Sequence, residues 1–596
     1  ATLQAEWPEH VAALQSEGIE TAQNAPQGLA IVGMTGSIDN DMWGTDSTIG
    51  FDSALARIVD AVDTLTSTAR SHQRSFVVEV MGRRCGWLAL AAAVATGADY
   101  VLIPEAPVAN WRQSLERAVQ RGRDAGRRKS IVFVAEGAVS LDGQAIRSEM
   151  VKHALDQSQE SESRITVLGH VQRGGAPSAR DRVMPTRMGV AAVDMLLNMD
   201  AESEPMVMTT AGDQVASKPL LYCVDKTRQT GAAITDRRFE QALRSRGPAF
   251  HDLLQIQFGS TPWIKPPSAQ RKLLVVNVGA PAPGMNAALQ TAVRWAGNQG
   301  VQVFAASEGF RGLLNGNVRL LSWQDVDGLA PMGATILGTN RYVPDPDLPE
   351  LKAVLEPYQG VVLIGGFAAL QIAPAIQAHV PVVVLPATIS NNLPGTEHSI
   401  GSDTAFNVIC EAIDRLKQSA VGSRDRVFFV EVMGRRCGYL ARTAGIAAGA
   451  EFVYTHEEGV RLAQIQNDIE DLLRAFDSGK SVAIVLASDG ASDAYDIHTL
   501  ARMYGEESKD RFDTRVCVLG HLQQGGRPTA ADRLLASRLA RAGVDALLDK
   551  QSGVIGEIAG LTVVSEFDSL SADVQCRRPS QQPSESASVL GLALPR

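Results

Sequence analysis

The stretch "RSFVVEVMGRRCGWLA", residues 74–89, joins an apolar run to a polar, glycine-bearing turn and then to a second apolar run. It returns as "RVFFVEVMGRRCGYLA" at residues 426–441. A strand that leads through a polar loop into a helix is the repeating unit of α/β folds with parallel sheets. The duplicated unit therefore predicts an α/β chain made of two homologous halves.

Two further matches keep the same register. "TGSIDNDMWGTDSTIG" (35–50) corresponds to "ATISNNLPGTEHSIG" (387–401), and "VLGHVQRGGAPSARDR" (167–182) corresponds to "VLGHLQQGGRPTAADR" (518–533). Matched positions lie 351 or 352 residues apart. A period this long is not that of a solenoid, so it indicates duplication and fusion of one ancestral half.

Within each half, β-branched runs alternate with amphipathic stretches, which favours largely parallel sheets flanked by helices. In the first half we expect strands at 29–33, 75–80, 99–103, 130–135 and 165–168. We expect helices near 52–69, 86–96, 109–125, 145–156 and 186–198.

The same pattern predicts the division of the chain. A first half is expected at 1–239, a helix and linker at 240–271, a second half at 272–578 and a disordered, Ser/Pro/Gln-rich tail at 579–596. The second half begins earlier in its own copy than the first half does, because the counterpart of Lys272 would precede Ala1. We therefore expect the front portion of the first half to be absent from this sequence.

The composition is that of an ordinary globular protein, with 45% hydrophobic and 20% charged residues. A net charge of −10 argues against a nucleic-acid-binding surface. Six cysteines without a CxxC pair favour reduced thiols over disulfides or a zinc site. No 18-residue apolar run or signal-peptide pattern occurs, so we expect a cytoplasmic protein with neither a nucleic-acid nor a membrane partner.

Four polar loops of the first half each follow a predicted strand. They are "TGSIDND" after 29–33, "MGRRCG" after 75–80, Glu136 after 130–135 and "GHVQRGG" after 165–168. Open parallel sheets bind ligands at the carboxyl ends of their strands, so these loops together predict one composite site.

Cationic and donor side chains in these loops suit a phosphorylated ligand. Arg83 and Arg173 can bind phosphate in a bidentate manner, and His170 can donate to it. His170 could equally be structural, because His521 persists in the second half.

The aspartates of the first loop suggest chemistry. Asp39 could accept a proton from a hydroxyl nucleophile, and Asp41 could position a metal–nucleotide complex. Each could instead be a turn or helix-cap residue, an interpretation that we favour for Asp46 because Glu397 keeps its charge in the other half.

Two arginines lie at the opposite ends of their strands. Arg74 and Arg164 precede predicted strands, as do their counterparts Arg426 and Arg515. From there they could reach a site in a neighbouring half or subunit, or they could form ordinary surface ion pairs.

Taken together, five motifs resemble the eukaryotic-type ATP-dependent 6-phosphofructokinases as far as about residue 578: "GSIDNDMWGTDSTIG", "VEVMGRRCG", "VLGHVQRGG", "GAPAPGMNAA" and "TISNNLPGTEHSIGSDTA". The resemblance implies transfer of the γ-phosphoryl group of Mg-ATP to the 1-hydroxyl of fructose 6-phosphate, a step of glycolysis. It implies Mg²⁺ as cofactor, allosteric regulation by fructose 2,6-bisphosphate, and a homo- or hetero-oligomer, as a tetramer, with sites shared across subunits.

The resemblance also implies roles for single residues. Asp39 would be the general base, with Asp41 and Arg83 as further catalytic residues, and Arg74 and Arg164 would serve an adjacent subunit. The substrate-binding set would be Ser37, Ile38, Asp39, Arg74, Met81, Gly82, Arg83, Glu136, Arg164, His170, Val171, Gln172 and Arg173.

In the second half the same positions would form an effector site. Its members would be Arg341, Thr388, Ile389, Ser390, Asn391, Asn392, Arg426, Met433, Gly434, Arg435, Arg515, His521, Leu522, Gln523, Gln524 and Arg577. Ser390 and Asn392 replace the two aspartates, which suits an anionic effector that must bind without reacting. Ser488 or Asp489 stands where the family often has a glutamate.

The nucleotide site departs from the family pattern. The glycine-rich first loop, the arginine pair and the "GGDGS" segment whose aspartate helps to hold Mg²⁺ do not occur in residues 1–271, and the second half has "GGFAA". We therefore expect the metal ligand in the missing front segment. A second interpretation is a catalytically silent, sugar-phosphate-binding regulatory subunit; a third, a pyrophosphate-dependent relative, is disfavoured by the duplicated effector half.

Overall fold

The structure, a computed structural model, describes residues 2–19, 28–72, 74–127, 129–158, 162–263, 271–420, 422 and 425–570. The predicted tail at 579–596, the linker residues 264–270 and Arg577 lie outside the described residues.

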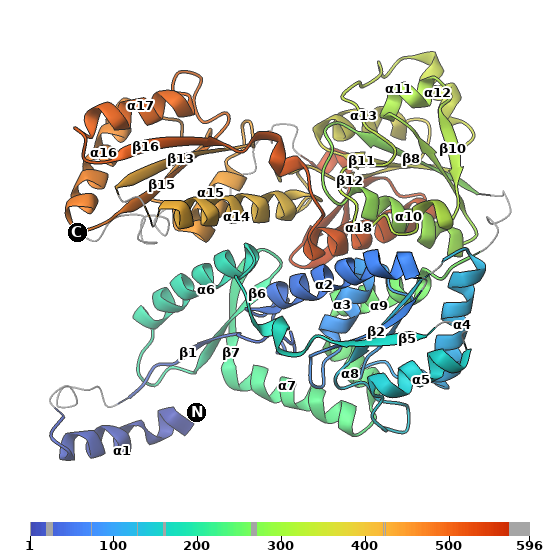
Figure 1. The fold of residues 1–596 in the computed structure, drawn as a ribbon, viewed down its shortest axis with the longest axis horizontal. Coiled ribbons are helices and arrows are strands. Elements are labelled where there is room, and N and C mark those ends of the chain that lie inside the picture. Colours follow the sequence, from blue (N-terminus) through green and yellow to red (C-terminus); the bar gives the residue numbers. More distant parts are fainter. Residues whose placement is uncertain are drawn as a thin grey trace.

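Each half contains a four-stranded, fully parallel sheet, which confirms the predicted α/β fold with two repeated halves (Figure 1). The strand order is β3-β4-β2-β5 in the first half and β14-β15-β13-β16 in the second. The bounds are β2 (Ser75–Val80), β3 (Tyr100–Leu102), β4 (Ser130–Ala135), β5 (Ser163–Val167), β13 (Arg426–Val432), β14 (Phe452–Tyr454), β15 (Val482–Ser488) and β16 (Asp513–Val518).

Helices flank both parallel sheets. Those of the first half are α2 (Phe51–His72), α3 (Trp87–Thr96), α4 (Trp111–Asp124) and α5 (Ser148–Ser158); those of the second are α14 (Ser402–Ala420), α15 (Tyr439–Ala448), α16 (Leu462–Asp477) and α17 (Ile497–Glu507). α3 is apolar on all sides and buried from Trp87 to Ala95, as expected for a helix enclosed by other elements.

A second sheet differs between the halves. In the second half it has the order β10-β9-β8-β11-β12-β17-β18, and in the first half only β1-β6-β7. β1 pairs with β6 as β12 pairs with β17, so the three first-half strands match one end of the larger sheet. Its strands are β1 (Val32–Met34), β6 (Met206–Ala211), β7 (Gln214–Pro219), β8 (Lys272–Val278), β9 (Gln302–Ala306), β10 (Val318–Leu321), β11 (Gly360–Gly365), β12 (Val382–Pro386), β17 (Gly553–Ile558) and β18 (Leu561–Ser565).

Most of the remaining helices pack around these sheets and between the halves, but the first of them lies apart from the sheets (Figure 1). They are α1 (Thr2–Ser16), α6 (Arg180–Leu197), α7 (Leu220–Thr235), α8 (Phe239–Ser245), α9 (Pro248–Gly259), α10 (Met285–Asn298), α11 (Gly309–Leu314), α12 (Pro349–Leu355), α13 (Phe367–Gln377) and α18 (Ala530–Leu548). Short 3₁₀ turns are η2 (Gly169–Arg173), η3 (Gln324–Val326), η4 (Gly520–Gln524) and η5 (Phe567–Ser569).

The sequence pattern missed some elements of the first half. The hairpin β6–β7 and α7 were not expected, because β6 is rich in Met and Thr and lacks a clear alternation. α6 begins at Arg180 rather than at 186, since Pro185 lies inside the helix and a proline is usually a mark of a helix start. β1 covers 32–34 rather than 29–33.

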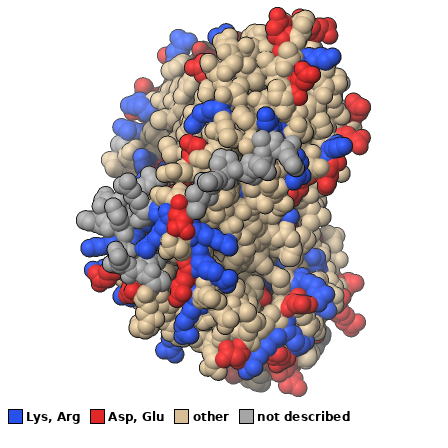
Figure 2. Space-filling model, turned by 90° about the vertical axis from the view of Figure 1, so that its right-hand side faces the viewer, with Lys and Arg blue, Asp and Glu red and all other residues tan. Residues whose placement is uncertain are grey.

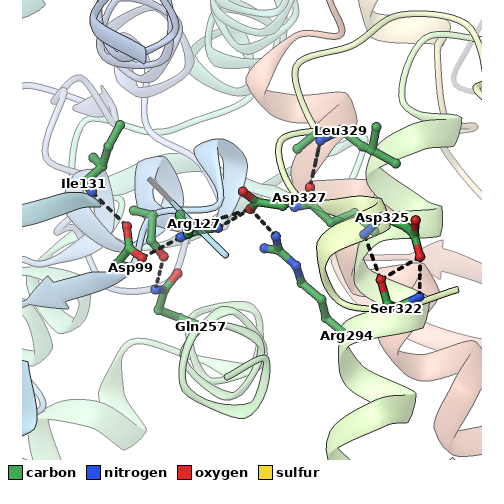
Figure 3. Close-up of polar contacts among 12 residues, drawn as sticks. Asp99, Arg127, Ile131, Gln257, Arg294, Ser322, Asp325, Asp327 and Leu329 are labelled. Atoms are coloured by element: carbon green, nitrogen blue, oxygen red, sulfur yellow. Dashed lines mark hydrogen bonds and ion pairs between the residues drawn. The ribbon is translucent and has the colours of Figure 1, made fainter. Parts of the chain in front are cut away.

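A buried network of charges joins the two halves near α4 and α10 (Figure 3). The Arg127 guanidinium lies 2.6 Å from Asp99 and 2.5 Å from Asp327, and Arg294 lies 2.7 Å from the same Asp327 oxygen. Both guanidinium groups also cover the Trp323 ring, at 4.8 and 4.2 Å from its centroid. The network fixes first-half residues 99 and 127 against second-half residues 294–327.

A second set of contacts between the halves consists of two equivalent ion pairs, related by the internal symmetry of the chain. Arg182 of α6 pairs with Asp414 of α14 at 2.6 Å, and Arg533 of α18 pairs with Asp63 of α2 at 2.6 Å. Arg533 is the counterpart of Arg182, and Asp414 is the counterpart of Asp63, each 351 residues further along the chain. The two halves thus face one another about an approximate twofold axis.

The segment between the halves is helical, as predicted for its first part. α9 packs on α3 through Phe250 and Trp87, whose ring centroids lie 5.1 Å apart. Its Asp252 pairs with Arg541 of α18 at 2.8 Å. α9 therefore contacts both halves.

The face in Figure 2, the right-hand side of Figure 1, carries Lys and Arg beside Asp and Glu around a broad area of other residues. Within the part of the chain that the structure describes, no helix is long and apolar enough to cross a membrane.

Candidate active site

The structure brings the four predicted loops together at the carboxyl ends of strands. Residues 37–41 follow β1, residues 81–83 follow β2, Glu136 follows β4, and η2 follows β5. The Met81 amide donates to Gln172 Oε1 at 3.2 Å, and the Arg83 amide donates to Glu136 Oε2 at 3.4 Å. The loops after β2, β4 and β5 are thus joined by side-chain contacts.

The loop after β1 is held by its own polar residues. Ser37 Oγ accepts from the Asp39 amide at 3.1 Å and donates to Asp41 Oδ1 at 3.2 Å. Asn40 adopts a left-handed conformation with φ 51°, and its Oδ1 accepts from the Thr48 amide at 2.9 Å. Asn40 therefore closes the loop on itself while Asp39 and Asp41 stay in place on either side.

Asp39 is the most buried carboxylate of these four loops. Its side chain is 6% exposed, and its Oδ1 is buried without a hydrogen-bond partner among the described residues. Burial raises the pKa of Asp39, and the neighbouring Asp41 carboxylate raises it further, while Arg83 and Arg173 act in the opposite direction. A desolvated carboxylate beside two guanidinium groups is suited to take a proton next to a bound anion.

The loop after β2 adopts a conformation that depends on glycine. Gly82 has φ 141°, and a Cβ there would lie 2.3 Å from the Cys85 carbonyl oxygen. Arg83 itself has φ 49°. Gly137 is equally constrained, because a Cβ there would lie 1.7 Å from the Arg83 carbonyl oxygen. The backbone of Arg83 thus lies directly on the strand end that carries Glu136.

The other predicted residues surround this centre. Ile38 is partly buried against the core beneath the site, and Gln172 is 2% exposed. His170, Val171 and Arg173 on η2 are exposed.

Arg74 and Arg164 lie away from the loops, at the amino ends of their strands. Arg74 directly precedes β2 and is half-buried. Arg164 is the second residue of β5, not a residue before the strand, and it is exposed and pairs with Glu162 at 2.6 Å. The structure therefore does not place these two arginines beside Asp39 of the same chain.

Asp46, which we interpreted as structural, has a structural contact. Its Oδ2 accepts from the Gly212 amide at the tip of the β6–β7 hairpin at 2.7 Å. Its counterpart Glu397 accepts from the Asp213 amide of the same hairpin at 3.1 Å. Both carboxylates therefore anchor the β6–β7 hairpin rather than line the loop site.

The second half repeats the architecture of the site. The Met433 amide donates to Gln523 Oε1 at 3.1 Å, as Met81 does to Gln172. Asn391 repeats Asn40, with φ 49° and an Oδ1 that accepts from the Ser399 amide at 2.7 Å.

The structure resolves the choice between Ser488 and Asp489. The Asp489 amide donates to the Val432 carbonyl as the Glu136 amide does to Val80, and the Arg435 amide donates to the Asp489 carboxylate. Asp489, one of the two residues that the sequence left open, therefore takes the place of Glu136. Ser488 ends β15 with its hydroxyl buried.

The remaining second-half residues divide into a loop group and a peripheral group. Those that follow strands at the repeated loops are Thr388, Ile389, Ser390, Asn391, Asn392, Met433, Gly434, Arg435, His521, Leu522, Gln523 and Gln524. Arg426 is the first residue of β13 and Arg515 the third residue of β16, so neither precedes its strand as predicted. Arg515 is exposed and pairs with Asp513 at 3.1 Å. Arg341 is exposed and follows Asn340, whose carbonyl accepts from the Gly279 amide of the glycine loop 279–284.

Two residues that no motif singled out contact the loops directly. Arg246, between α8 and α9, pairs with Glu105, which follows β3. No local signal marks either residue, because their partners are far away in sequence.

The fold and the site together define a duplicated α/β protein whose first half presents a buried carboxylate and exposed arginines at strand ends, and whose second half keeps the scaffold without that carboxylate. The family model described as Phosphofructokinase matches residues 10–196 and 272–547. The chain belongs to the phosphofructokinase family.

Individual relatives agree with this assignment. The ATP-dependent 6-phosphofructokinase, muscle type, of Mus musculus is 42% identical over 554 residues, which cover 90% of this chain and 71% of the relative. The Homo sapiens protein of the same name gives the same values. The structure of phosphofructokinase from Saccharomyces cerevisiae has a TM-score of 0.93 at 35% identity and covers 99% of this chain and 84% of that chain. Pichia pastoris phosphofructokinase in the T-state has a TM-score of 0.87 at 37% identity, with coverages of 95% and 68%.

Proposed function

We propose that this protein transfers the γ-phosphoryl group of Mg-ATP to the 1-hydroxyl of fructose 6-phosphate, yielding fructose 1,6-bisphosphate. The observation that carries the proposal is Asp39, a buried carboxylate with an unpartnered oxygen on which the charges of Arg83 and Arg173 act. The names of the relatives, ATP-dependent 6-phosphofructokinases, support the same reaction.

In this proposal Asp39 accepts the proton of the sugar hydroxyl as that oxygen attacks phosphorus. Arg83 and Arg173 stabilise the negative charge of the phosphate groups. Glu136 binds sugar hydroxyls, and Met81, Gly82 and the η2 residues 170–173 shape the sugar-phosphate site.

Magnesium enters this reaction as part of the Mg-ATP substrate. Mg²⁺ bound to nucleotides keeps several waters and needs only one or two protein carboxylates. Asp41 lies two residues after Asp39 in the same loop, and its Oδ1 accepts a hydrogen bond from the Ser37 hydroxyl. We propose that Asp41 orients the hydrated metal, whose charge offsets that of the transferred group.

We further propose that the second half binds fructose 2,6-bisphosphate as an effector. Ser390 and Asn392 occupy the places of the catalytic aspartates, so the second-half loop has no base, while Arg435 and His521 keep the anion-binding positions. We also propose a cytoplasmic oligomer, a tetramer in its simplest form, in which Arg74, Arg164, Arg426 and Arg515 reach sites of adjacent subunits.

A coupled assay of the purified chain tests the catalytic proposal. We expect fructose 6-phosphate- and ATP-dependent formation of fructose 1,6-bisphosphate, and we expect it to be lost in Asp39→Ser. If the chain binds fructose 6-phosphate but shows no turnover under any effector condition, the proposed activity is wrong for this polypeptide.

A second candidate is a silent, sugar-phosphate-binding regulatory subunit. It is favoured by the second half, whose β8 and β11 lead into the glycine loops 279–284 and 365–366, for which the described first half has no counterpart. Turnover by the chain alone excludes this candidate.

The effector proposal has its own test. Arg426→Ala is expected to weaken activation by fructose 2,6-bisphosphate and to leave the rate without effector unchanged. A large loss of that basal rate would instead assign Arg426 to a catalytic site.

A further inference from the structure

Arg246 forms one of the most deeply buried ion pairs of the described chain. Its side chain is 6% exposed and that of Glu105 is 0% exposed, with 2.7 Å between Arg246 Nε and Glu105 Oε1. Burying two charges is costly unless their remaining hydrogen-bonding groups are also satisfied. The other contacts of this pair therefore indicate what it serves.

Those contacts lead to the two loops of the candidate active site. Arg246 donates to the Asp41 carbonyl at 3.2 Å and to the Arg84 carbonyl at 3.0 Å. Glu105 accepts from the Gly86 amide with both oxygens, each at 3.0 Å. A single guanidinium thus bridges the loop that carries Asp39 and the loop that carries Arg83.

Both contacts of Arg246 with the loops are made to backbone carbonyl oxygens. They hold the path of the two loops themselves. The left-handed conformation of Arg83, at φ 49°, is one that an arginine adopts only under constraint, and the bonds at Arg84 and Gly86 hold the chain immediately after it.

The second half provides an internal comparison. Glu457, the counterpart of Glu105, still accepts from the Gly438 amide, at 2.9 and 3.1 Å. The carboxylate–amide part of the arrangement is thus common to both halves.

We propose that Arg246 is a positioning residue for the reaction: it holds the Asp39 loop and the Arg83 loop at a fixed separation. The inference rests on the proposed function, in which Asp39 takes the proton and Arg83 stabilises the phosphate charge. Displacing reacting groups by about 1 Å can cost 10²-fold in rate. Loss of the bridge therefore lowers turnover more than it lowers binding of the sugar phosphate.

Kinetics of three variants test the proposal. Arg246→Met removes the bridge, Arg246→Lys keeps the charge beside Glu105 but cannot reach both carbonyls, and Arg244→Met is the control, because Arg244 is 79% exposed on the same helical segment. We expect kcat to fall by about 30- to 100-fold in Arg246→Met, with KM for fructose 6-phosphate changed less than threefold, an intermediate kcat in Arg246→Lys, and wild-type values in Arg244→Met.

Two results would overturn the proposal. One is an Arg246→Lys enzyme of normal thermal stability with unchanged kcat. The other is a folded Arg246→Met enzyme whose loss appears in KM alone. If Arg246→Met does not fold, the lysine variant alone decides between these outcomes.

A second measurement does not depend on turnover. Hydrogen exchange of the Gly86 amide and of the amides at 41–44 is expected to speed up at least tenfold in Arg246→Met and not in Arg244→Met. If the wild-type chain shows no turnover, the catalytic proposal fails while this measurement still decides whether Arg246 fixes the loops. Unchanged exchange would overturn the positioning role.

Discussion

Asp39 and Ser390 occupy the same place in two copies of one loop, and the surroundings explain why the difference matters. The loop geometry is retained through Asn40 and Asn391, both in the left-handed conformation. What the sequence could predict here was the residue types and their place after a strand. The burial of Asp39 and its unpartnered oxygen depend on distant segments, so they required the structure.

Replacing Asp39 by serine tests the base directly. We expect turnover to fall by about 10²–10⁴-fold, the contribution of a general base, with little change in the affinity for fructose 6-phosphate. Isothermal titration and the coupled assay measure the two quantities. A collapse of affinity at unchanged turnover of the bound substrate would contradict the assigned role.

The pH dependence of kcat reports the same carboxylate. Asp39 acts as a base only when ionised, and its pKa lies above the ordinary range because of burial and Asp41. We therefore expect kcat to fall as the pH is lowered through that raised pKa. Asp41→Asn should shift the falling limb to lower pH, since it removes the negative neighbour, and Arg173→Met should shift it to higher pH. Shifts in the reverse directions would show that another group controls the profile.

At the level of elements, α6 and α18 show how one sequence pattern can have two environments. Val193 on α6 is 55% exposed, whereas its counterpart Val544 on α18 is 0% exposed. α18 packs against α10, and the described first half has no helix in the equivalent place. The sequence predicted a helix near 186–198, but it could not tell whether the apolar face of that helix is covered.

The matched pair of valines gives a stability prediction. Val544→Ala is expected to lower the free energy of unfolding by about 2 kcal/mol, because it removes two buried methyl groups and leaves a cavity. Val193→Ala is expected to change it by less than about 0.5 kcal/mol. Chemical denaturation of both variants measures the difference, and equal losses would mean that the α6 face is covered in solution.

At the level of the whole molecule, the two halves meet through buried charges and through apolar clusters that both halves share, in which Ala530 packs with first-half residues and Ala179 with second-half residues. The duplicated register predicted two similar halves, and the parallel sheets confirm it. The contacts between the halves were not predictable, because Arg127 with Asp327 and Arg533 with Asp63 are separated by 200 and 470 residues and follow no local pattern.

Two aspartates at this junction make stability depend on pH. Burial and the charge of Asp403 raise the pKa of Asp52 to about 7, against the favourable effect of Arg180, and Asp181 adds to the rise. Burial and Asp532 raise the pKa of Asp403 to about 6. Since the folded state then holds more protons than the unfolded chain between about pH 4 and 7, stability is expected to fall as the pH rises through this range.

Asp52→Asn tests this linkage. The amide oxygen can still accept from Ser178 Oγ, which lies 2.5 Å from Asp52 Oδ2, while the negative charge is removed. We expect a gain in the free energy of unfolding of up to about 4 kcal/mol at pH 8, the value of a shift of about three pKa units, and a smaller gain at pH 5. Asp60→Asn, on the exposed side of the same helix, is the control. A loss of stability at pH 8 would contradict the electrostatic explanation.

Arg180 stands beside both of these aspartates, and the position 351 residues later is Ala531. In a dimer of identical chains, one codon specifies both sides of the symmetry axis, so an arginine there would appear twice or not at all. After duplication and fusion, the two equivalent positions are encoded separately and can mutate independently. One guanidinium can then interact with a pair of carboxylates without a second guanidinium beside it. Arg180 can therefore face two aspartates while its counterpart position holds the uncharged Ala531.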